Sequence, residues 1–325
     1  MLGTRWGCKP LLAAVLVLLA GFGWLGAGWW SSGPLPQNLA FIVPDGSSLG
    51  SIAVKLEKEG AITSSAAFRL RARIFGAGST IKAGEFDLPK HASMSRVLNI
   101  IAGDEVLRRF VTVPEGMPSI MVYDRLMANP NLTGTIEVPA EGSVLPDTYE
   151  IAKGESRQAV VLRMQAAMQR SLAELWAKRS PNTVAKTPQE AVVLASIVEK
   201  ETGKPSERPM VAGLYSNRVR TSMLLQADPT VIYPITKGKP LGRRIRQSEL
   251  NAVNDYNTYA MTGLPKGPIT NPGRASIEAV LNPAQTEALY MVADGTGGHA
   301  FAATLPEHNA NVEKWFTIRK ARGDF

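Results

Sequence analysis

Cysteine and histidine are scarce in this sequence of 325 residues, which contains one and three of them respectively. A single cysteine, Cys8, excludes an intrachain disulfide, so the fold does not depend on the redox state of its compartment. His91, His299 and His308 do not have the spacing of metal ligands. We therefore expect neither a metal site nor a cofactor, and no thiolate chemistry.

Nucleic-acid-binding motifs and internal repeats are also missing. The formal net charge of +8 and the pI near 9.6 suit an anionic partner. The basic residues are scattered, however, and the densest group, Arg243, Arg244 and Arg246, is interpreted as a solvated face. We expect no nucleic acid among the partners. With 45% hydrophobic and 20% charged residues, the chain can bury a core and is long enough for two modest domains.

Charged residues are absent from residues 11–30, an apolar run that would span roughly 30 Å as a helix. Arg5 and Lys9 precede this run and tryptophans gather towards its far end, as the positive-inside rule and the aromatic belt predict. The sequence therefore predicts a single-pass anchor in the lipid of the inner (plasma) membrane. Residues 1–10 would be a cytoplasmic tail, residues 31–38 a short tether, and the remainder extracytoplasmic.

Two other interpretations of the N-terminus are less favourable. A cleaved signal peptide has a shorter apolar core and a small-residue cleavage site, whereas this run ends in the bulky Trp29 and Trp30. A lipoprotein signal places its cysteine after the apolar run, whereas Cys8 precedes it. The uncleaved anchor is therefore the preferred interpretation.

Helical and extended segments are mixed without a regular alternation. Strands are predicted at 38–43, 82–88 and 108–113, and helices after Ser47 or Ser48, and at 65–75, 94–102, 157–178, 188–202 and 207–220. The region 225–303 reads as turns with short strands. This mixture predicts an α+β fold and argues against a doubly wound parallel sheet.

A G-x-S-x-G pattern at Gly46, Ser48 and Gly50 is the one candidate nucleophile motif. Pro44 interrupts the preceding strand, and no βα units surround the pattern to build a hydrolase sheet. The serines are fully explained as helix caps. A serine hydrolase is therefore disfavoured.

The predicted helix 188–202 has the clearest local design. Thr187 is the expected N-cap, Pro188 the first helical residue, and Glu190 completes a capping box. Gly203 and Pro205 end the helix. Glu190 therefore has a structural role.

Glu201 shares a helical stripe with Leu194, Ile197 and Val198, at positions i+7, i, i+3 and i+4. Apolar neighbours raise the pKa of a carboxyl, as a general acid near neutral pH requires. Glu199 lies on another face, where we expect a solvated carboxylate paired with a nearby base. The alternative for Glu201 is that it reaches solvent or a salt bridge, and spacing alone leaves both interpretations open.

Several long motifs, in a fixed order, resemble the YceG-like family of endolytic murein transglycosylases. They are VPDGSSLGSIAVKLEKEGAI (43–62), VPEGMP (113–118), EGSVLPDTY (141–149), LASIVEKETGKPSERPMVAGLYSNRV (194–219), LQADPTVIY (225–233), YNTY (256–259), GLPKGPITNPG (263–273) and VADGTGGHAF (292–301). The resemblance implies an α+β protein with a transmembrane helix, a LysM-like subdomain at residues 39–110 and a catalytic domain at 111–325. It covers nearly the whole chain.

The resemblance also implies a reaction and its acid. Glu201 is the second glutamate of the family's E-K-E-T motif, which makes it the expected catalytic residue. The expected substrate is the glycan strand of peptidoglycan, cut between N-acetylmuramic acid and N-acetylglucosamine to leave 1,6-anhydro ends. Cell-wall synthases are expected partners, since the family's role suggests termination of new strands.

Side chains that hydrogen-bond or stack on sugars follow in the later motifs. We nominate as substrate-binding residues Gln226, Asp228, Tyr256, Asn257 and Tyr259. Hydrogen bonds that merely stabilise loops are the alternative for each of them. His299, in its glycine-rich surroundings, is expected to hold a turn.

Two rival functions stay open at this point. A catalytically silent glycan-binding scaffold for wall synthases would suit the anchor and the LysM-like part. A water-using muramidase would need a second carboxyl, for which Asp228 is the candidate.

Overall fold

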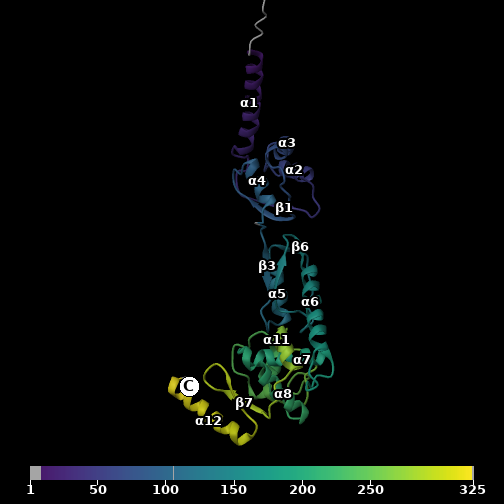
Figure 1. Ribbon diagram of the computed structural model, residues 1–325. Coiled ribbons are helices and arrows are strands. Elements are labelled where there is room, and N and C mark those ends of the chain that lie inside the picture. Colours follow the sequence, from purple (N-terminus) through teal and green to yellow (C-terminus); the bar gives the residue numbers. More distant parts are fainter. Residues whose placement is uncertain (1–8, 105, 324–325) are drawn as a thin grey trace, which may run out of the picture. The chain divides into compact units, whose positions relative to one another are not determined.

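The computed structural model describes residues 9–104 and 106–323 (Figure 1). Its contacts divide the chain into two compact units, with the division between Arg108 and Arg109. We call the N-terminal part unit 1 and the C-terminal part unit 2. The expected cytoplasmic tail lies almost entirely outside the described residues, as does Cys8. The expected domain boundary after residue 110 lies two residues beyond the division.

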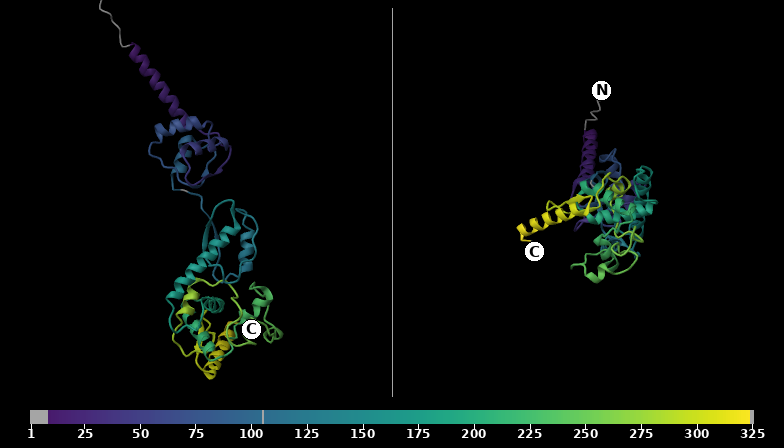
Figure 2. Two further views of the ribbon diagram at one scale, coloured as in Figure 1. Left: turned by 90° about the vertical axis from the view of Figure 1, so that its right-hand side faces the viewer. Right: turned by 90° about the horizontal axis from the view of Figure 1, so that it is seen from below.

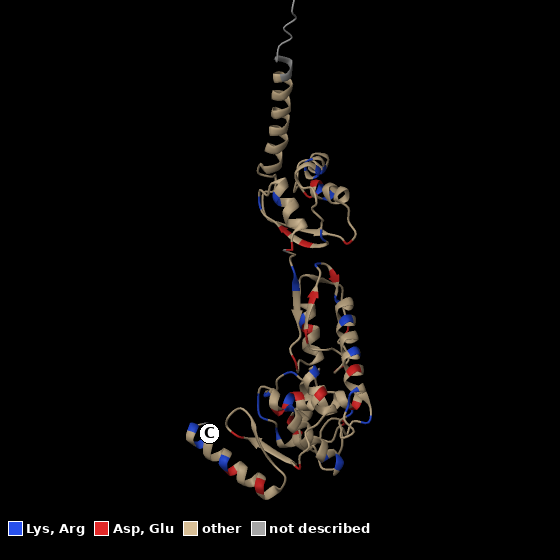
Figure 3. Cartoon of the chain, in the orientation of Figure 1, with Lys and Arg blue, Asp and Glu red and all other residues tan. Residues whose placement is uncertain are grey.

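Helix α1 (Lys9–Trp30) is the apolar helix that the sequence predicts. Residues 12–30 carry no charge, as Figure 3 shows, and most of these side chains are exposed. Its length and composition suffice to cross a membrane. Trp29 at its end is only 3% exposed and stacks on Phe75.

Residues 31–38, expected as a short tether, pack against the rest of unit 1. The backbone N–H of Gly33 donates to the carbonyl of His91 (3.1 Å), and that of His91 donates to the carbonyl of Leu35 (3.0 Å). Leu35 is buried in the unit 1 core. A Cβ on Gly33 would meet the Ala92 carbonyl oxygen at 2.0 Å, so only glycine permits this approach.

The rest of unit 1 follows the order strand, two helices, strand and helix. These elements are β1 (Leu39–Val43), α2 (Leu49–Lys58), α3 (Ser65–Phe75), β2 (Gly84–Leu88) and α4 (Met94–Ala102). β1 and β2 pair antiparallel, and Phe41, Phe68 and Phe86 fill the core between the pair and the helices. Ser48 accepts a hydrogen bond from Ser51 N and caps α2, which confirms the interpretation of the serine pattern as a cap.

The strand expected at 108–113 is β3 (Arg109–Thr112), and it belongs to unit 2. It pairs antiparallel with β5 (Thr148–Ile151), with Val111 opposite Tyr149. The remaining elements of unit 2 are α5 (Ser119–Met127), β4 (Leu132–Thr133), β6 (Glu155–Ser156), α6 (Arg157–Ala177), α7 (Pro188–Glu201), the 3-10 turn η1 (Pro205–Glu207), α8 (Arg208–Arg220), α9 (Asp228–Thr236), α10 (Gln247–Leu250), α11 (Arg274–Leu281), β7 (Tyr290–Ala293), β8 (His299–Ala302) and α12 (Leu305–Arg322). The chain is therefore α+β, as predicted.

Three helices occupy the region expected to be turn-rich: the four-residue α10 and the longer α9 and α11. α9 begins with Asp228 and Pro229 and contains Pro234, so its sequence resembles a loop. α11 has only eight residues, too few for a clear period, yet five of them are buried. α11 packs on both α7 and α8.

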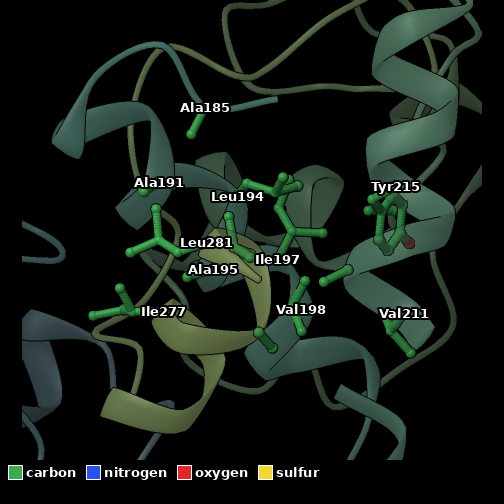
Figure 4. Close-up of a cluster of buried hydrophobic side chains, with 14 of the residues drawn as sticks. Ala185, Ala191, Leu194, Ala195, Ile197, Val198, Val211, Tyr215, Ile277 and Leu281 are labelled. Carbon is green, nitrogen blue, oxygen red and sulfur yellow. The ribbon is translucent and has the colours of Figure 1, made fainter. Parts of the chain in front are cut away.

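α7 is the central helix of unit 2. Every residue from Ala191 to Val198 is buried, because α6, α8, α9 and α11 all contact it. Figure 4 shows Leu194, Ile197 and Val198 between the side chains of α8 and those of α11. By contrast, α12 has no buried residue and projects from the rest of unit 2, beside the β7–β8 hairpin (Figure 2).

Candidate active site

Glu201 is the last residue of α7, and its position follows from local sequence. Thr187 caps the helix by accepting a hydrogen bond from Glu190 N (3.1 Å), with Pro188 in the first turn. Glu190 accepts from Lys186 N (2.6 Å), one residue earlier than a capping box requires, so it does have the expected structural role. The short η1 turn then leads directly into α8, which packs on α7.

The Glu201 carboxyl is held away from water without a full set of partners. Its Oε1 atom is buried and accepts no hydrogen bond from the described residues. The pKa of Glu201 is raised to about 7, mainly by burial and also by the negative charge of Asp228, whereas the Tyr215 hydroxyl and the Arg218 charge lower it. A group with this pKa exchanges its proton readily near neutral pH, as general acid–base catalysis requires.

Glu199 is different, but not in the way that the sequence predicts. Its side chain is only 5% exposed, so the expectation of a solvated carboxylate is wrong. One oxygen accepts hydrogen bonds from Gly273 N (2.9 Å) and Ser276 Oγ (2.7 Å), and the other lies 3.4 Å from an Arg208 nitrogen. α7 is buried on nearly every side, so partners, not the helix face, distinguish the two glutamates. Glu199 is a structural link between α7, α8 and α11.

Asp228 and Tyr259 lie beside the Glu201 carboxyl. The Tyr259 hydroxyl donates to Asp228 Oδ1 (2.6 Å), and both side chains act electrostatically with Glu201. Two buried threonines hold the segments that carry them, because Thr230 Oγ1 and Thr258 Oγ1 lie 2.8 Å apart and each also accepts a backbone N–H from the other segment. The structure thus brings together three residues that are distant in sequence.

The other nominated residues have different surroundings. Asn257 is fully buried, and its amide donates to the carbonyls of Glu249, Leu250 and Ala252. This is the loop-stabilising alternative, and it leaves the Asn257 amide buried and occupied. Tyr256 is half-buried and packs 4.9 Å from the Tyr233 ring. Gln226 is exposed and has a left-handed backbone with φ of 53°.

Tyr215 and Arg218, which the sequence reasoning missed, complete the surroundings of the acid. They lie three residues apart on α8, and therefore on one face of that helix. Arg218 is 8% exposed and donates to the carbonyls of Leu225 (2.6 Å) and Leu289 (2.7 Å). A short connection between α7 and α8 predicts that the helices pack together. An arginine on the face of α8 that packs against α7 was therefore the sequence signal for a cation near Glu201.

Glu141 is a second carboxyl with a raised pKa. Burial raises its pKa to about 6, against hydrogen bonds from Ser119 and Tyr233. Its Oε1 accepts from Ser119 N (2.8 Å) and from the Asn271 amide (3.3 Å). These bonds join the start of α5 to the segment before α11. Glu141 is therefore partnered and structural, whereas Glu201 keeps one buried oxygen without a partner among the described residues.

His299 pairs with Glu207 of the η1 turn, whereas Asp294 holds the glycine-rich turn itself. The Nδ1 of His299 lies 2.8 Å from Glu207 Oε2, and its backbone N–H donates to Glu207 Oε1 (3.0 Å). The pair fixes the β7–β8 hairpin to the η1 turn. No group of three or more His, Cys, Asp or Glu side chains within residues 9–104 and 106–323 is arranged to hold a metal ion.

Together these features define an α+β protein whose candidate site is one carboxyl with a buried, unpartnered oxygen, a neighbouring Asp–Tyr pair and a buried arginine. The YceG-like family model matches residues 41–314, so the chain belongs to the YceG-like family. The acid lies within that match.

Named relatives agree with this assignment. The chain is 28% identical over 313 residues to the endolytic murein transglycosylase of Bacillus subtilis (strain 168), covering 86% of this chain and 85% of that protein. It is 26% identical over 319 residues to the protein of the same name from Streptococcus pneumoniae serotype 2, covering 83% of this chain and 57% of that one. A crystal structure of a yceG-like protein from Listeria monocytogenes has a TM-score of 0.54 and 25% identity, covering 84% of this chain and 98% of that chain.

Proposed function

We propose that the chain is a lyase, an endolytic transglycosylase that cuts the glycan strands of peptidoglycan, with Glu201 as its catalytic residue. The observation that carries the proposal is the buried Oε1 atom without a partner on a carboxyl of pKa about 7. The family assignment and the names of the relatives support the substrate class.

The proposed reaction uses the one carboxyl twice. Protonated Glu201 donates to the glycosidic oxygen as the bond from C1 of N-acetylmuramic acid breaks. The resulting carboxylate then accepts the proton of the C6 hydroxyl, whose oxygen bonds to C1 and closes a 1,6-anhydro ring. No water is consumed, and Glu201 returns to its protonated form.

Opposing charges around Glu201 support this double role. Burial and Asp228 favour the protonated form that the first step needs, whereas Tyr215 and Arg218 favour the carboxylate that the second step needs. The two influences leave the pKa near 7, where neither form is costly to reach. Asp228 accepts a hydrogen bond from the Tyr259 hydroxyl, and in this proposal its negative charge would stabilise the positive charge that develops on the sugar ring.

Sugar contacts are assigned within the same proposal. Gln226, Asp228, Tyr256 and Tyr259 remain the candidates, since their side chains can hydrogen-bond or stack on pyranose rings. The strand, two helices and strand of residues 39–110 support a LysM-like subdomain that holds the glycan. A place beside the cell-wall synthases rests on the resemblance alone.

The membrane assignment belongs to the proposal as well. α1 would anchor the protein in the inner (plasma) membrane as a single span. The basic residues that precede its apolar run favour a cytoplasmic N-terminus, which places both units outside the cytoplasm. Anchoring keeps the site close to newly made strands.

Product masses test the reaction. The detergent-solubilised full chain is incubated with purified glycan strands, and the fragments are weighed. Anhydro ends, lighter by one water than reducing ends, are expected from the wild type and from Glu190→Gln, a control on the same helix. Glu201→Gln should give none. Reducing ends would indicate a hydrolase with Asp228 as second carboxyl, and uncut strands a non-catalytic scaffold.

A further inference from the structure

A cavity of about 470 Å³ lies in unit 2 next to the segments that surround Glu201. One wall is the end of α7, where Lys200 lines the cavity directly before Glu201. Another wall is α9, where Pro229 and Ile232 line it directly after Asp228, whose charge acts on Glu201. Neighbouring α-carbons are only about 3.8 Å apart. The cavity is therefore lined by the residue next to Glu201 on α7 and by the residue next to Asp228 on α9.

The cavity is mostly apolar. Its lining includes Pro114, Met117, Pro118, Met121, Pro229 and Ile232. Such walls suit small apolar groups and an extended backbone, and they suit a bare, heavily hydroxylated sugar less well. The occupant should therefore carry short apolar side chains.

One cation at the cavity stands apart from its charged neighbours. Glu115 is paired with Arg208 (2.7 Å), and Lys239 is paired with Asp124 (2.7 Å). Lys200 is exposed and forms no ion pair within the described part of the chain. Its ammonium is available to an anionic group of a ligand.

We propose that this cavity is the subsite for the peptide carried by the muramic acid residue at the cleavage point, with Lys200 receiving a peptide carboxylate. The inference rests on the proposed function, because that reaction places the muramic ring at Glu201. The ring bears its peptide through a lactyl ether. Such peptides contain alanine and D-glutamate, so they combine small apolar side chains with free carboxylates, and this is the chemistry of the cavity.

The test compares two substrates for the full chain in detergent: strands that retain their peptides, and strands from which an amidase has removed them. Lys200→Ala is expected to lower kcat/KM about tenfold on the first, mainly through KM, since it loses one charge-assisted contact. On the second, the change should stay below twofold. Lys200→Arg should retain most of the activity on both.

Two further variants separate the subsite from general effects. Lys186→Ala removes an exposed lysine at the other end of α7 and should change neither rate. Pro240→Trp fills the cavity without altering charge, and should reproduce the selective loss on peptide-bearing strands.

Other outcomes are distinguishable. Equal losses on both substrates for Lys200→Ala would mean that Lys200 supports the acid. A loss confined to the stripped strands would mean that Lys200 binds the lactyl carboxylate that the amidase frees. Either result refutes the peptide subsite while the lytic function stands. No loss on either refutes the subsite as well. A wild type that cuts neither substrate refutes the proposed function itself.

Discussion

Replacing Glu201 with glutamine is expected to abolish cleavage and also to change how the stability of unit 2 depends on pH. The wild-type carboxyl has a pKa of about 7 in the folded chain, against 4.5 for an ordinary glutamate. Each unit of difference corresponds to about 1.4 kcal/mol, so the full shift is worth about 3 kcal/mol. This is the free energy that ionising Glu201 removes from the folded state.

The pKa of Glu201 is higher in the folded chain than in the unfolded chain, and this order sets the direction in which stability changes with pH. Below about pH 4.5 the carboxyl is protonated in both the folded and the unfolded chain, so it has no effect. Between 4.5 and 7 only the unfolded chain releases the proton, and the free energy of unfolding therefore falls as pH rises. Above about 7 both states are ionised and the loss is complete.

Glutamine cannot titrate, so the variant lacks this component. Any fixed cost of placing an amide at position 201 cancels when the same variant is compared at about pH 5 and about pH 8. The wild type should lose about 3 kcal/mol more than Glu201→Gln between these two values.

Urea unfolding measures this difference. The fluorescence of Trp176, which packs against the core that contains α7, reports on unit 2. Identical pH dependence in the wild type and the variant would show that the carboxyl is not desolvated in solution. The same result would remove the physical basis for its role as an acid.

Three further substitutions test the site's surroundings. Glu199→Gln should lower the free energy of unfolding by about 2 kcal/mol, because the new amide nitrogen would face Arg208. The folded variant should still cut strands, and a folded but inactive variant would contradict our choice of acid. Asp228→Asn should move the alkaline limb of the pH profile of kcat/KM to lower pH, since the Asp228 charge raises the pKa of Glu201; an unmoved limb contradicts this. Asn257→Ala should destabilise by at least about 2 kcal/mol, seen as a lower urea midpoint.

Local sequence by itself determined much of this protein. The length and composition of the apolar run predict α1 regardless of the rest of the fold. Caps act within one turn of a helix, so the neighbouring residues suffice to assign Thr187 as a cap and to narrow the other cap to Ser47 or Ser48, of which the structure shows Ser48. The helical stripe made Glu201 a candidate acid but left a solvent-facing alternative open, and the E-K-E-T motif favoured it only through the family resemblance.

Only the tertiary structure decided what surrounds each carboxyl. Glu199 and Glu201 are two residues apart on one buried helix, and helical spacing wrongly assigned Glu199 to solvent. Its partners Gly273 and Ser276 come from α11 and the residue that precedes it, more than 70 residues later, in a region without a readable period. Arg208 at the start of α8 and Asp228 at the start of α9 complete the contrast between the two glutamates.

The same limit explains Asn257 and the cavity beside Lys200. An asparagine in a YNTY motif has the chemistry to bind a sugar, and nothing local reveals that its amide is used by three backbone carbonyls. The cavity beside Lys200 likewise forms from segments between residues 114 and 269. The burial of a polar group and the hydrogen bonds that it forms depend on atoms from several distant segments. The sequence pattern does not give the positions of these atoms.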